Sequence, residues 1–422
     1  MTLIPMPATA TAAQPGNDNL GVIQAWRAAG WRPHRGLPAD QSIALVHDWC
    51  PSFRGGERVL AELGRTFGAR DLYTLFDFLD SDTRTAHFGG VRFHTSHANR
   101  WPGVRKYYRH LFPLCPLLME QFDVTGHDAV ISSSAAFARG VITRPDQPHL
   151  CYVHSPVRYA WDEQFSYLEQ LRLGNGPKGL LYRVLMHRLR NWDTRTAWGP
   201  DVMAANSSYV RARIRRIYGR DAEVVFPPVS APEDAWSAEK DDYYVTASFM
   251  APYKRTDLVI RAFNAMPRRR LLVVGEGQQA KALRDLAGPN VVFTGFLPRD
   301  DYFRTVARAR ALVFGGCEDF GIALAEAQLL GTPLIAFGRG GAVDIVRSPE
   351  DTGDPTGLLF SRQEETAVIG AVEAFEADRG RFTPGACREN ADRFSVARFQ
   401  AGIRRAFAMA EDAARSATHG AR

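Results

Sequence analysis

Short apolar runs alternate with amphipathic stretches along this 422-residue chain. The run SIALVHDW, residues 42–49, predicts a buried strand, and Gly55 and Gly56 then precede a predicted helix. Apolar residues recur in that helix with a period of about 3.6, at Val59, Leu60, Leu63 and Phe67. Two more apolar runs, residues 128–134 and 149–155, are bounded by polar residues and predict further strands.

The second half of the chain shows the same alternation. It predicts strands at residues 243–249, 270–277, 291–296, 311–316 and 333–338, and helices at 256–266, 300–309 and 322–330. No close internal repeat relates the two halves. Strands that alternate with helices are typical of parallel, doubly wound sheets, which bind ligands beyond the carboxyl ends of their strands. The predicted fold class is therefore α/β, with two Rossmann-like domains facing across a cleft.

The predicted domain boundary falls in residues 224–242, where three closely spaced prolines and then charged residues interrupt the pattern. The N-terminal domain is predicted at 42–230 and the C-terminal domain at 231–392. Residues 1–41 are rich in small residues and proline, which predicts a disordered tail. With 45% hydrophobic and 23% charged residues, the chain has enough apolar material for two domain cores.

Composition limits the compartment and the partners. The five cysteines are scattered singly, so neither a disulfide framework nor a zinc site is expected. No signal peptide or membrane span is apparent, which predicts a cytoplasmic protein. A net charge of +6 favours anionic partners, namely nucleotide phosphates, nucleic acid or an anionic lipid surface. Nucleic acid is not expected as a partner, because no nucleic-acid-binding motif is present.

The most informative segment is CEDFGIALAEAQLLGTPLIAFGRGG, from Cys317, in which seven residues separate Glu318 from Glu326. Glu318 is predicted in the loop after a strand and Glu326 early in the next helix. The backbone N–H groups of Phe320, Gly321 and Ile322 would form the start of that helix, whose partial positive charge suits a diphosphate. On spacing alone, two carboxylates stabilised by the helix dipole explain the pattern equally well.

This segment resembles the Glu–seven residues–Glu motif of the retaining glycosyltransferases of family 4, which have the GT-B fold. Further similar segments are 131–140, 204–214, 224–229 and 390–399, so the resemblance covers most of residues 42–408. It is strongest to bacterial polysaccharide and O-antigen mannosyltransferases. The resemblance implies that Glu318 contacts the donor sugar and Glu326 the ribose. It also implies that the last helix, within 393–422, crosses back to the N-terminal domain before a short tail.

The segment ASFMAPYKRTDLVIRAF, from Ala247, resembles the phosphate-binding turn of the same family. The family carries an Arg and, five residues later, a Lys. Lys254 occupies the Lys position here, but Phe249 stands in place of the usual Arg. Arg255 is the nearest substitute, or else an ordinary charge at a helix start. A missing cation weakens stabilisation of the departing diphosphate unless another cation replaces it.

Three other positions resemble donor-site positions of the family. Gly55 and Gly56 correspond to its glycine-rich first loop, although a tight turn also explains a diglycine. His154, at the predicted end of a strand, corresponds to a histidine near the donor sugar, with Arg158, Tyr159 and Trp161 either lining the acceptor side or simply packing. Gly275 and Gly277 correspond to a turn near the nucleotide, and an ordinary strand-to-helix turn is the alternative.

Residues 99–122 and 179–192 interleave basic residues with aromatic and apolar ones. Such segments suit an anionic bilayer surface and predict peripheral attachment at the inner face of the cell membrane. Two amphipathic helices packed on the N-terminal core explain them equally well.

The predicted function is transfer of mannose from GDP-mannose to an acceptor, expected to be an oligosaccharide on a polyprenyl diphosphate, in exopolysaccharide or O-antigen synthesis. The expected catalytic residues are Glu318, His154 and Lys254. The expected donor-binding residues are Gly55, Gly56, Lys254, Arg255, Gly275, Gly277, Phe320, Gly321, Ile322 and Glu326. No metal or cofactor is expected. Alternatives are a UDP- or dTDP-sugar donor, a sugar-nucleotide-binding protein without activity, and a glycoside hydrolase, which would need no phosphate site.

Overall fold

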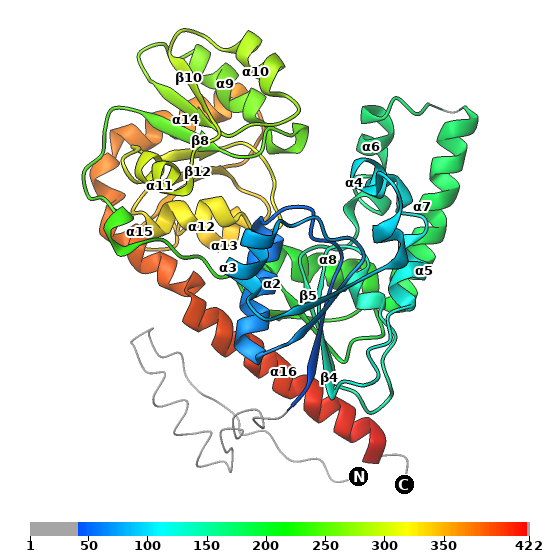
Figure 1. Cartoon of the computed structure of the whole chain (residues 1–422). Coiled ribbons are helices and arrows are strands. Elements are labelled where there is room, and N and C mark those ends of the chain that lie inside the picture. Colours follow the sequence, from blue (N-terminus) through cyan, green and yellow to red (C-terminus); the bar gives the residue numbers. More distant parts are fainter. Residues whose placement is uncertain (1–40, 175, 420–422) are drawn as a thin grey trace, which may run out of the picture. The chain divides into compact units, whose positions relative to one another are not determined.

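The computed structural model describes residues 41–174 and 176–419, and all but one residue of the predicted tail at 1–41 lie outside this range. The described chain contains two sheets, each built of parallel strands (Figure 1). The first has seven strands in the order β3-β2-β1-β4-β5-β6-β7, and the second has six in the order β10-β9-β8-β11-β12-β13. We call residues 41–224 the N-terminal lobe and residues 244–394 the C-terminal lobe. The prediction of two doubly wound α/β units is confirmed.

The N-terminal lobe alternates strands with helices. Its strands are β1 (Ile43–His47), β2 (Asp71–Thr74), β3 (Arg92–Thr95), β4 (Ala129–Ser134), β5 (His149–Val153), β6 (Val202–Ala205) and β7 (Glu223–Val224). Its helices are α2 (Gly55–Phe67), α3 (Ser81–Phe88), α4 (Val104–Tyr107), α5 (Cys115–Glu120), α6 (Gln164–Gln170), α7 (Pro177–Thr196) and α8 (Ser208–Tyr218). The three predicted strands of this half are β1, β4 and β5, and every residue in them is buried, as expected for a sheet covered on both faces.

The C-terminal lobe repeats the plan. Its strands are β8 (Tyr244–Ala247), β9 (Leu271–Val274), β10 (Val291–Gly295), β11 (Leu312–Phe314), β12 (Leu334–Phe337) and β13 (Gly357–Phe360). Its helices are α9 (Thr256–Asn264), α10 (Ala280–Leu286), α11 (Arg299–Ala307), α12 (Ile322–Leu329), α13 (Ala342–Ile345), α14 (Glu365–Ala377) and α15 (Pro384–Ala391). All predicted strands and helices of this half are present.

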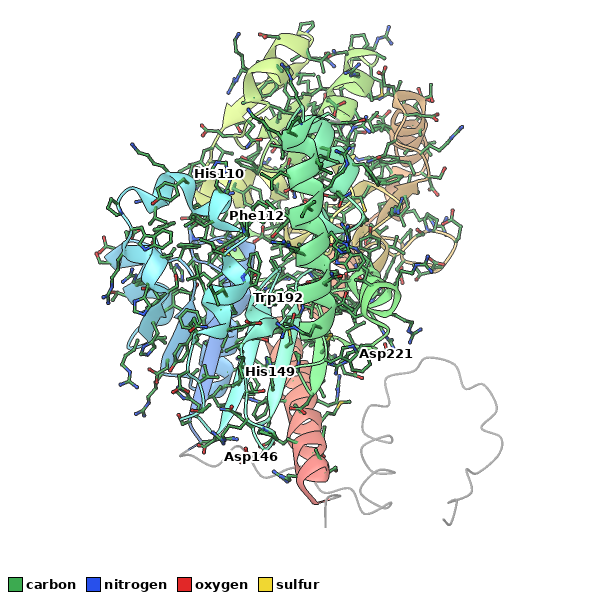
Figure 2. The ribbon with its side chains drawn as sticks, turned by 90° about the vertical axis from the view of Figure 1, so that its right-hand side faces the viewer. His110, Phe112, Asp146, His149, Trp192 and Asp221 are labelled. Atoms are coloured by element: carbon green, nitrogen blue, oxygen red, sulfur yellow. The ribbon has the colours of Figure 1, made fainter. Side chains whose placement is uncertain are left out.

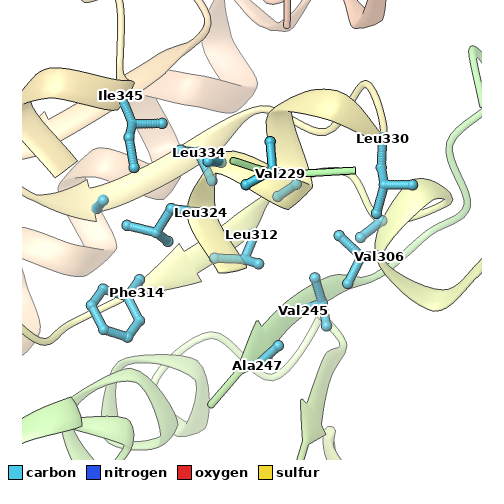
Figure 3. Close-up of a cluster of buried hydrophobic side chains, with 14 of the residues drawn as sticks. Val229, Val245, Ala247, Val306, Leu312, Phe314, Leu324, Leu330, Leu334 and Ile345 are labelled. Atoms are coloured by element: carbon cyan, nitrogen blue, oxygen red, sulfur yellow. The ribbon is translucent and has the colours of Figure 1, made fainter. Parts of the chain in front are cut away.

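One of the two apolar cores of the C-terminal lobe fixes the position of α12 against the sheet. Leu312 and Phe314 of β11 pack with Leu324 of α12, and Leu334 of β12 closes the cluster (Figure 3). Val229, in the segment between the lobes, belongs to the same core, and its backbone N–H donates to the carbonyl of Phe394 at 2.9 Å. The start of α12 is therefore held directly beyond the carboxyl end of β11.

The long helix α16 (Val396–His419) leaves the C-terminal lobe and packs along strands β5 and β6 of the other lobe (Figure 1). Aromatic contacts join Phe399 to Tyr152 and Phe407 to Phe67, with ring centroids 5.8 and 5.1 Å apart. Gln400 also donates to the Glu62 carboxylate at 2.7 Å. The chain thus crosses between the lobes twice, once after β7 and once before α16.

Strands β2, β3, β6, β7 and β13 were not predicted. They are short, and edge strand β3, with the sequence RFHT, has one exposed and three half-buried residues and therefore no apolar run. Among the described residues, no helix is both long and apolar enough to cross a membrane.

A buried ion pair ties α7 to the middle of the N-terminal lobe. The Arg139 guanidinium pairs with the Asp193 carboxylate, and both side chains are fully buried. The same carboxylate accepts hydrogen bonds from Trp161 Nε1 at 2.7 Å and from the Tyr218 hydroxyl at 3.0 Å. Asp193 is therefore the shared acceptor for three elements.

We expect Asp193→Ala to lower the free energy of unfolding by about 3–5 kcal/mol, because it leaves the Arg139 charge buried without a partner. Urea unfolding followed by circular dichroism measures this loss. The control is Asp221→Ala, since Asp221 pairs with Arg211 and Arg215 at the surface (Figure 2). Equal losses in the two variants would contradict the assigned role.

Candidate functional site

A cavity of about 540 Å³ lies where the carboxyl ends of the strands of both lobes meet. Its walls include residues of the first turns of α2, of the segment after β5, of the turn after β8 and of the start of α12. A second cavity, of about 450 Å³, lies against α15 and contains none of the residues predicted from the sequence. The first cavity, called the cleft below, is the candidate site.

The cleft brings together most of the predicted site residues. Its lining includes Gly55, Gly56, His154, Lys254, Glu318, Phe320, Gly321 and Ile322. Arg255, Gly275, Gly277 and Glu326 do not line it.

The central charged pair of the cleft is Lys254 with Glu318. Lys254 ends the turn after β8, Glu318 lies in the loop after β11, and the ammonium donates to the carboxylate. Gly316 makes the approach of the two loops possible, because a Cβ there would lie 2.8 Å from the carbonyl oxygen of Lys254. Both side chains remain partly accessible, with exposed fractions of 12% and 26%. An anionic ligand could therefore compete for the ammonium and leave the carboxylate to accept from hydroxyl groups.

Helix α12 begins at the cleft wall without a side-chain cap. Its N-cap residue, Gly321, has a φ of +98°, a conformation that favours glycine. Uncapped N–H groups at a helix start carry a partial positive charge and bind anions. The predicted anion-binding helix start is thus located beside Lys254 and Glu318.

Glu326 lies one turn into α12 and is only 4% exposed. Its carboxylate is bound by Arg58 of α2 at 2.9 Å and by Arg299 of α11 at 3.1 Å. Arg58 comes from the N-terminal lobe, so this pair joins the two lobes. The role predicted for Glu326 in ribose binding stays a prediction, since both arginines occupy its carboxylate.

The other three residues that miss the cleft have local structural partners. Arg255 is the N-cap of α9, with a φ of +53°, and its Nε donates to Asp257 at 3.2 Å. A Cβ on Gly275 would lie 2.2 Å from the Ser248 carbonyl oxygen, and one on Gly277 would lie 2.6 Å from backbone atoms of Met250. In the structure, Arg255 is therefore a charge at a helix start, and Gly275 and Gly277 lie in a closely packed turn after a strand.

His154 directly follows β5 and contacts the cleft with a half-buried ring. Its Nε2 lies 2.8 Å from the Ser133 hydroxyl, and its ring meets that of His47 edge-on. Burial, followed by the proximity of His47, lowers the pKa of His154 from its ordinary value of 6.5 to about 3. The ring is therefore neutral near pH 7 and suited to hydrogen bonding rather than to proton donation.

Two aspartates that sequence reasoning did not single out organise the site. Asp319 pairs with Arg158 at 2.6 Å and with Arg213 at 3.2 Å, which links the α12 loop to the N-terminal lobe. Asp48, after β1, accepts from four consecutive backbone N–H groups, those of Ala135 to Ala138, at 2.6–2.8 Å. It thereby fixes the loop in which Ala135 lines the cleft. Neither partnership has a signal in sequence spacing, because the partners are far apart along the chain.

No group of three or more His, Cys, Asp or Glu residues suited to a metal ion occurs within 41–174 and 176–419.

Residues 232–394 match the family model described as "Glycosyl transferases group 1". A GDP-mannose-dependent alpha-(1-6)-phosphatidylinositol monomannoside mannosyltransferase of Mycobacterium tuberculosis is 29% identical over 215 residues, 43% of this chain and 54% of that protein. A GDP-mannose-dependent mannosyltransferase of Corynebacterium glutamicum, acting on a monoacylated phosphatidylinositol mannoside, is 32% identical over 190 residues, 38% of this chain and 48% of that protein. The matched regions thus span about half the length of these relatives.

Solved structures resemble a larger part of the chain. Anabaena HepE in complex with UDP and glucose has a TM-score of 0.61 at 17% identity, over 86% of this chain and 98% of that one. Sucrose-phosphate synthase of Thermosynechococcus elongatus has a TM-score of 0.63 at 18% identity, with the same coverage. At such identities the likeness shows the fold alone, which is the GT-B fold of glycosyltransferases.

We expect the pH dependence of stability to report the neutral state of His154. Its pKa in the folded protein lies below the ordinary value of 6.5, so the unfolded chain takes up the proton first as pH falls. This contribution to stability is complete above pH 6.5 and is lost progressively toward pH 3. His154→Gln should therefore lose less stability than the wild type between pH 6.5 and 5 in urea unfolding.

The control for this experiment is His187→Gln, on the exposed side of α7, which should keep the wild-type pH dependence. If the stability of His154→Gln depends on pH as steeply as that of the wild type, the His154 ring is protonated in the folded protein.

Proposed function

Because residues 232–394 form a glycosyl transferases group 1 domain within a GT-B fold, we propose that this protein is a retaining mannosyltransferase of family 4 that uses GDP-mannose. The observation that carries the proposal is the cleft itself. Lys254, Glu318 and the uncapped start of α12 surround one cavity, although they come from separate segments of the chain. A nucleotide-sugar needs both a cationic diphosphate site and a carboxylate for sugar hydroxyls, and this cavity offers both.

The proposed reaction forms a bond between an acceptor hydroxyl oxygen and the anomeric carbon of the donor, and breaks the bond from that carbon to the diphosphate. The hydroxyl proton leaves with the diphosphate or to solvent. Lys254 and the α12 dipole stabilise the negative charge that develops on the departing diphosphate. Glu318 and neutral His154 orient the sugar through hydrogen bonds. The proposal includes no metal or cofactor, because the diphosphate charge is met by these groups.

Mannose and the guanine base are supported by the two bacterial relatives, whose names specify GDP-mannose. A UDP-sugar donor is the second candidate, because HepE, with the same fold, binds UDP and glucose. A sugar-nucleotide-binding protein without turnover is the third, since Phe249 replaces the usual cation of the phosphate turn.

The acceptor is proposed to be a lipid-linked saccharide of polysaccharide or O-antigen synthesis, reached at an anionic membrane surface from the cytoplasmic side. The names of the two relatives contain a phosphatidylinositol-based acceptor, which supports a lipid anchor. On this chain, Leu114 and Leu117 of the α5 region and Leu180 and Leu181 of α7 are 41–61% exposed. Figure 1 shows α5 alongside α7, and Figure 2 labels His110 in the segment before α5, where Arg105, Lys106 and Arg109 are exposed. Exposed apolar side chains beside basic ones favour an anionic bilayer.

Turnover and donor choice test the proposal together. Among GDP-mannose, UDP-glucose and dTDP-glucose, we expect GDP-mannose to raise the thermal midpoint most. With a polyprenyl-diphosphate-linked saccharide as acceptor, Glu318→Ala and Lys254→Ala should each lower the rate of GDP release by roughly 100-fold, as loss of one charge-stabilising group does elsewhere. The thermal midpoint of each variant should stay near that of the wild type.

Lys281→Ala and Glu373→Ala, at exposed positions of α10 and α14, are the matched controls and should keep full activity. Wild-type rates in Glu318→Ala or Lys254→Ala would refute the site. Tight donor binding without GDP release would support the third candidate, a sugar-nucleotide-binding protein without turnover. A larger shift of the thermal midpoint with UDP-glucose would support a UDP-sugar as the donor.

The membrane surface is tested by sedimentation with vesicles. We expect the protein to bind phosphatidylglycerol vesicles at low salt and not phosphatidylcholine vesicles, because the attraction is partly electrostatic. The double variant Leu117→Asp, Leu181→Asp should bind at least about tenfold more weakly, since it removes apolar area from the contact. Met409→Asp, at an exposed apolar position of α16, should bind as the wild type does. Failure of the wild type to sediment would exclude this surface.

A further inference from the structure

We infer that Arg54 is a further donor-binding residue, whose guanidinium supplies the diphosphate from the N-terminal lobe with the cation that Phe249 does not provide. The inference rests on the proposed function. Arg54 lies in the loop just before α2, and sequence reasoning assigned it no role.

The first argument is the charge balance of the cleft. Its lining contains the cations Lys254 and Arg158 and the carboxylates Glu163, Glu318 and Asp319. Lys254 is paired with Glu318, and Arg158 is paired with both Asp319 and Glu163. Within the described lining, each of these two cations is therefore already neutralised. A diphosphate can take these cations only by displacing a carboxylate from them, so a further cation without a carboxylate partner would add to the stabilisation of its charge.

The second argument is the position of the Arg54 guanidinium. Its Cζ lies 5.1 Å from the centroid of the Phe249 ring, within the range of a cation–π contact. Phe249 lines the cleft and is 42% exposed, so the ring supports the guanidinium at the cleft margin. No carboxylate among the described residues pairs with Arg54. Neither Arg54 nor Arg255 belongs to the cleft lining, but Arg255 is paired with Asp257, whereas Arg54 lies against a ring that lines the cleft.

The third argument is the close packing that places Arg54. A Cβ on Gly55 would lie 2.8 Å from Cδ1 of Ile322, so the first residue of α2 lies directly against the first residue of α12. The backbone of Arg54, the preceding residue, is thereby held near the start of α12, and its guanidinium lies over Phe249. A cation beside a helix start is unfavourable unless an anion joins them. The arrangement of guanidinium, ammonium and helix start is therefore suited to a bound diphosphate.

Substitution of Arg54 should not disturb the fold. The start of α2 is stabilised by the Glu57 carboxylate, which accepts from the backbone N–H of Arg54 at 2.9 Å. That hydrogen bond does not involve the guanidinium. Changes of binding in Arg54 variants therefore reflect the loss of the guanidinium charge and not a loss of α2.

The test is calorimetric titration of GDP and of UDP into the wild type, Arg54→Ala, Arg54→Lys and the double variant Arg54→Ala, Phe249→Arg. We expect Arg54→Ala to weaken binding of the better nucleotide by about tenfold, as for loss of one charge-assisted contact. Arg54→Lys should lose less affinity than Arg54→Ala, because it keeps a positive charge at this position. The double variant should recover most of the affinity, because it restores a cation at the same point from the other lobe. The salt dependence of binding should also become weaker in Arg54→Ala.

Arg70→Ala is the matched control, because Arg70 is exposed and precedes β2 at the edge of the sheet opposite the cleft. Weakened binding in Arg54→Ala with wild-type binding in Arg70→Ala supports the inference. If Lys254→Ala loses affinity while Arg54→Ala binds as the wild type does, the inference is overturned and the proposed function stands. If the wild type binds neither nucleotide, both are overturned.

Discussion

The parallel arrangement of the strands is the constraint on which the site depends. Because both sheets are parallel and covered by helices, every strand ends at the same edge of its sheet, and every loop that can carry polar side chains toward a ligand leaves from that edge. The loops after β1, β5, β8 and β11 all contribute to the cleft or to its support. Each lobe alone therefore presents half of the candidate site, and the cleft is formed where the two edges meet.

The charged side chains at this edge occur in sets of opposite sign. Lys254 with Glu318, Arg58 and Arg299 with Glu326, and Arg158 and Arg213 with Asp319 each combine at least one cation with one carboxylate. In the absence of a ligand, such pairing limits the cost of holding charges of like sign together in a partly desolvated space. Under the proposed function, a nucleotide-sugar would bind by exchanging partners with these paired groups.

The fold was largely predictable from the sequence, and the site only in part. Strand β1 is apolar in four consecutive residues, and the regular apolar period of α2 ends at a glycine, so the local pattern was sufficient to predict both elements. Short edge strands such as β3 lack that pattern and were missed. Lys254, Glu318 and Gly321 were found because each belongs to a recognisable local motif.

The residues that sequence reasoning missed have partners far along the chain. Asp319 meets Arg213, Arg58 meets Glu326, and Arg54 meets Phe249, and each of these contacts joins the two lobes. Spacing within a segment contains no information about such contacts. The phosphate contact suggested for Arg255 by its proximity in sequence to Lys254 stays a prediction, and in the structure Arg255 pairs with Asp257.

The double crossing of the chain between the lobes has a mechanical consequence. One connection lies after β7 and the other just before α16, and α16 is anchored on β5 and β6 by aromatic and polar contacts. Two tethers at separate points leave a rigid body little freedom except rotation about the line that joins them. Any widening of the cleft must then bend both connections together, so the two lobes can open only by rotating about one shared axis.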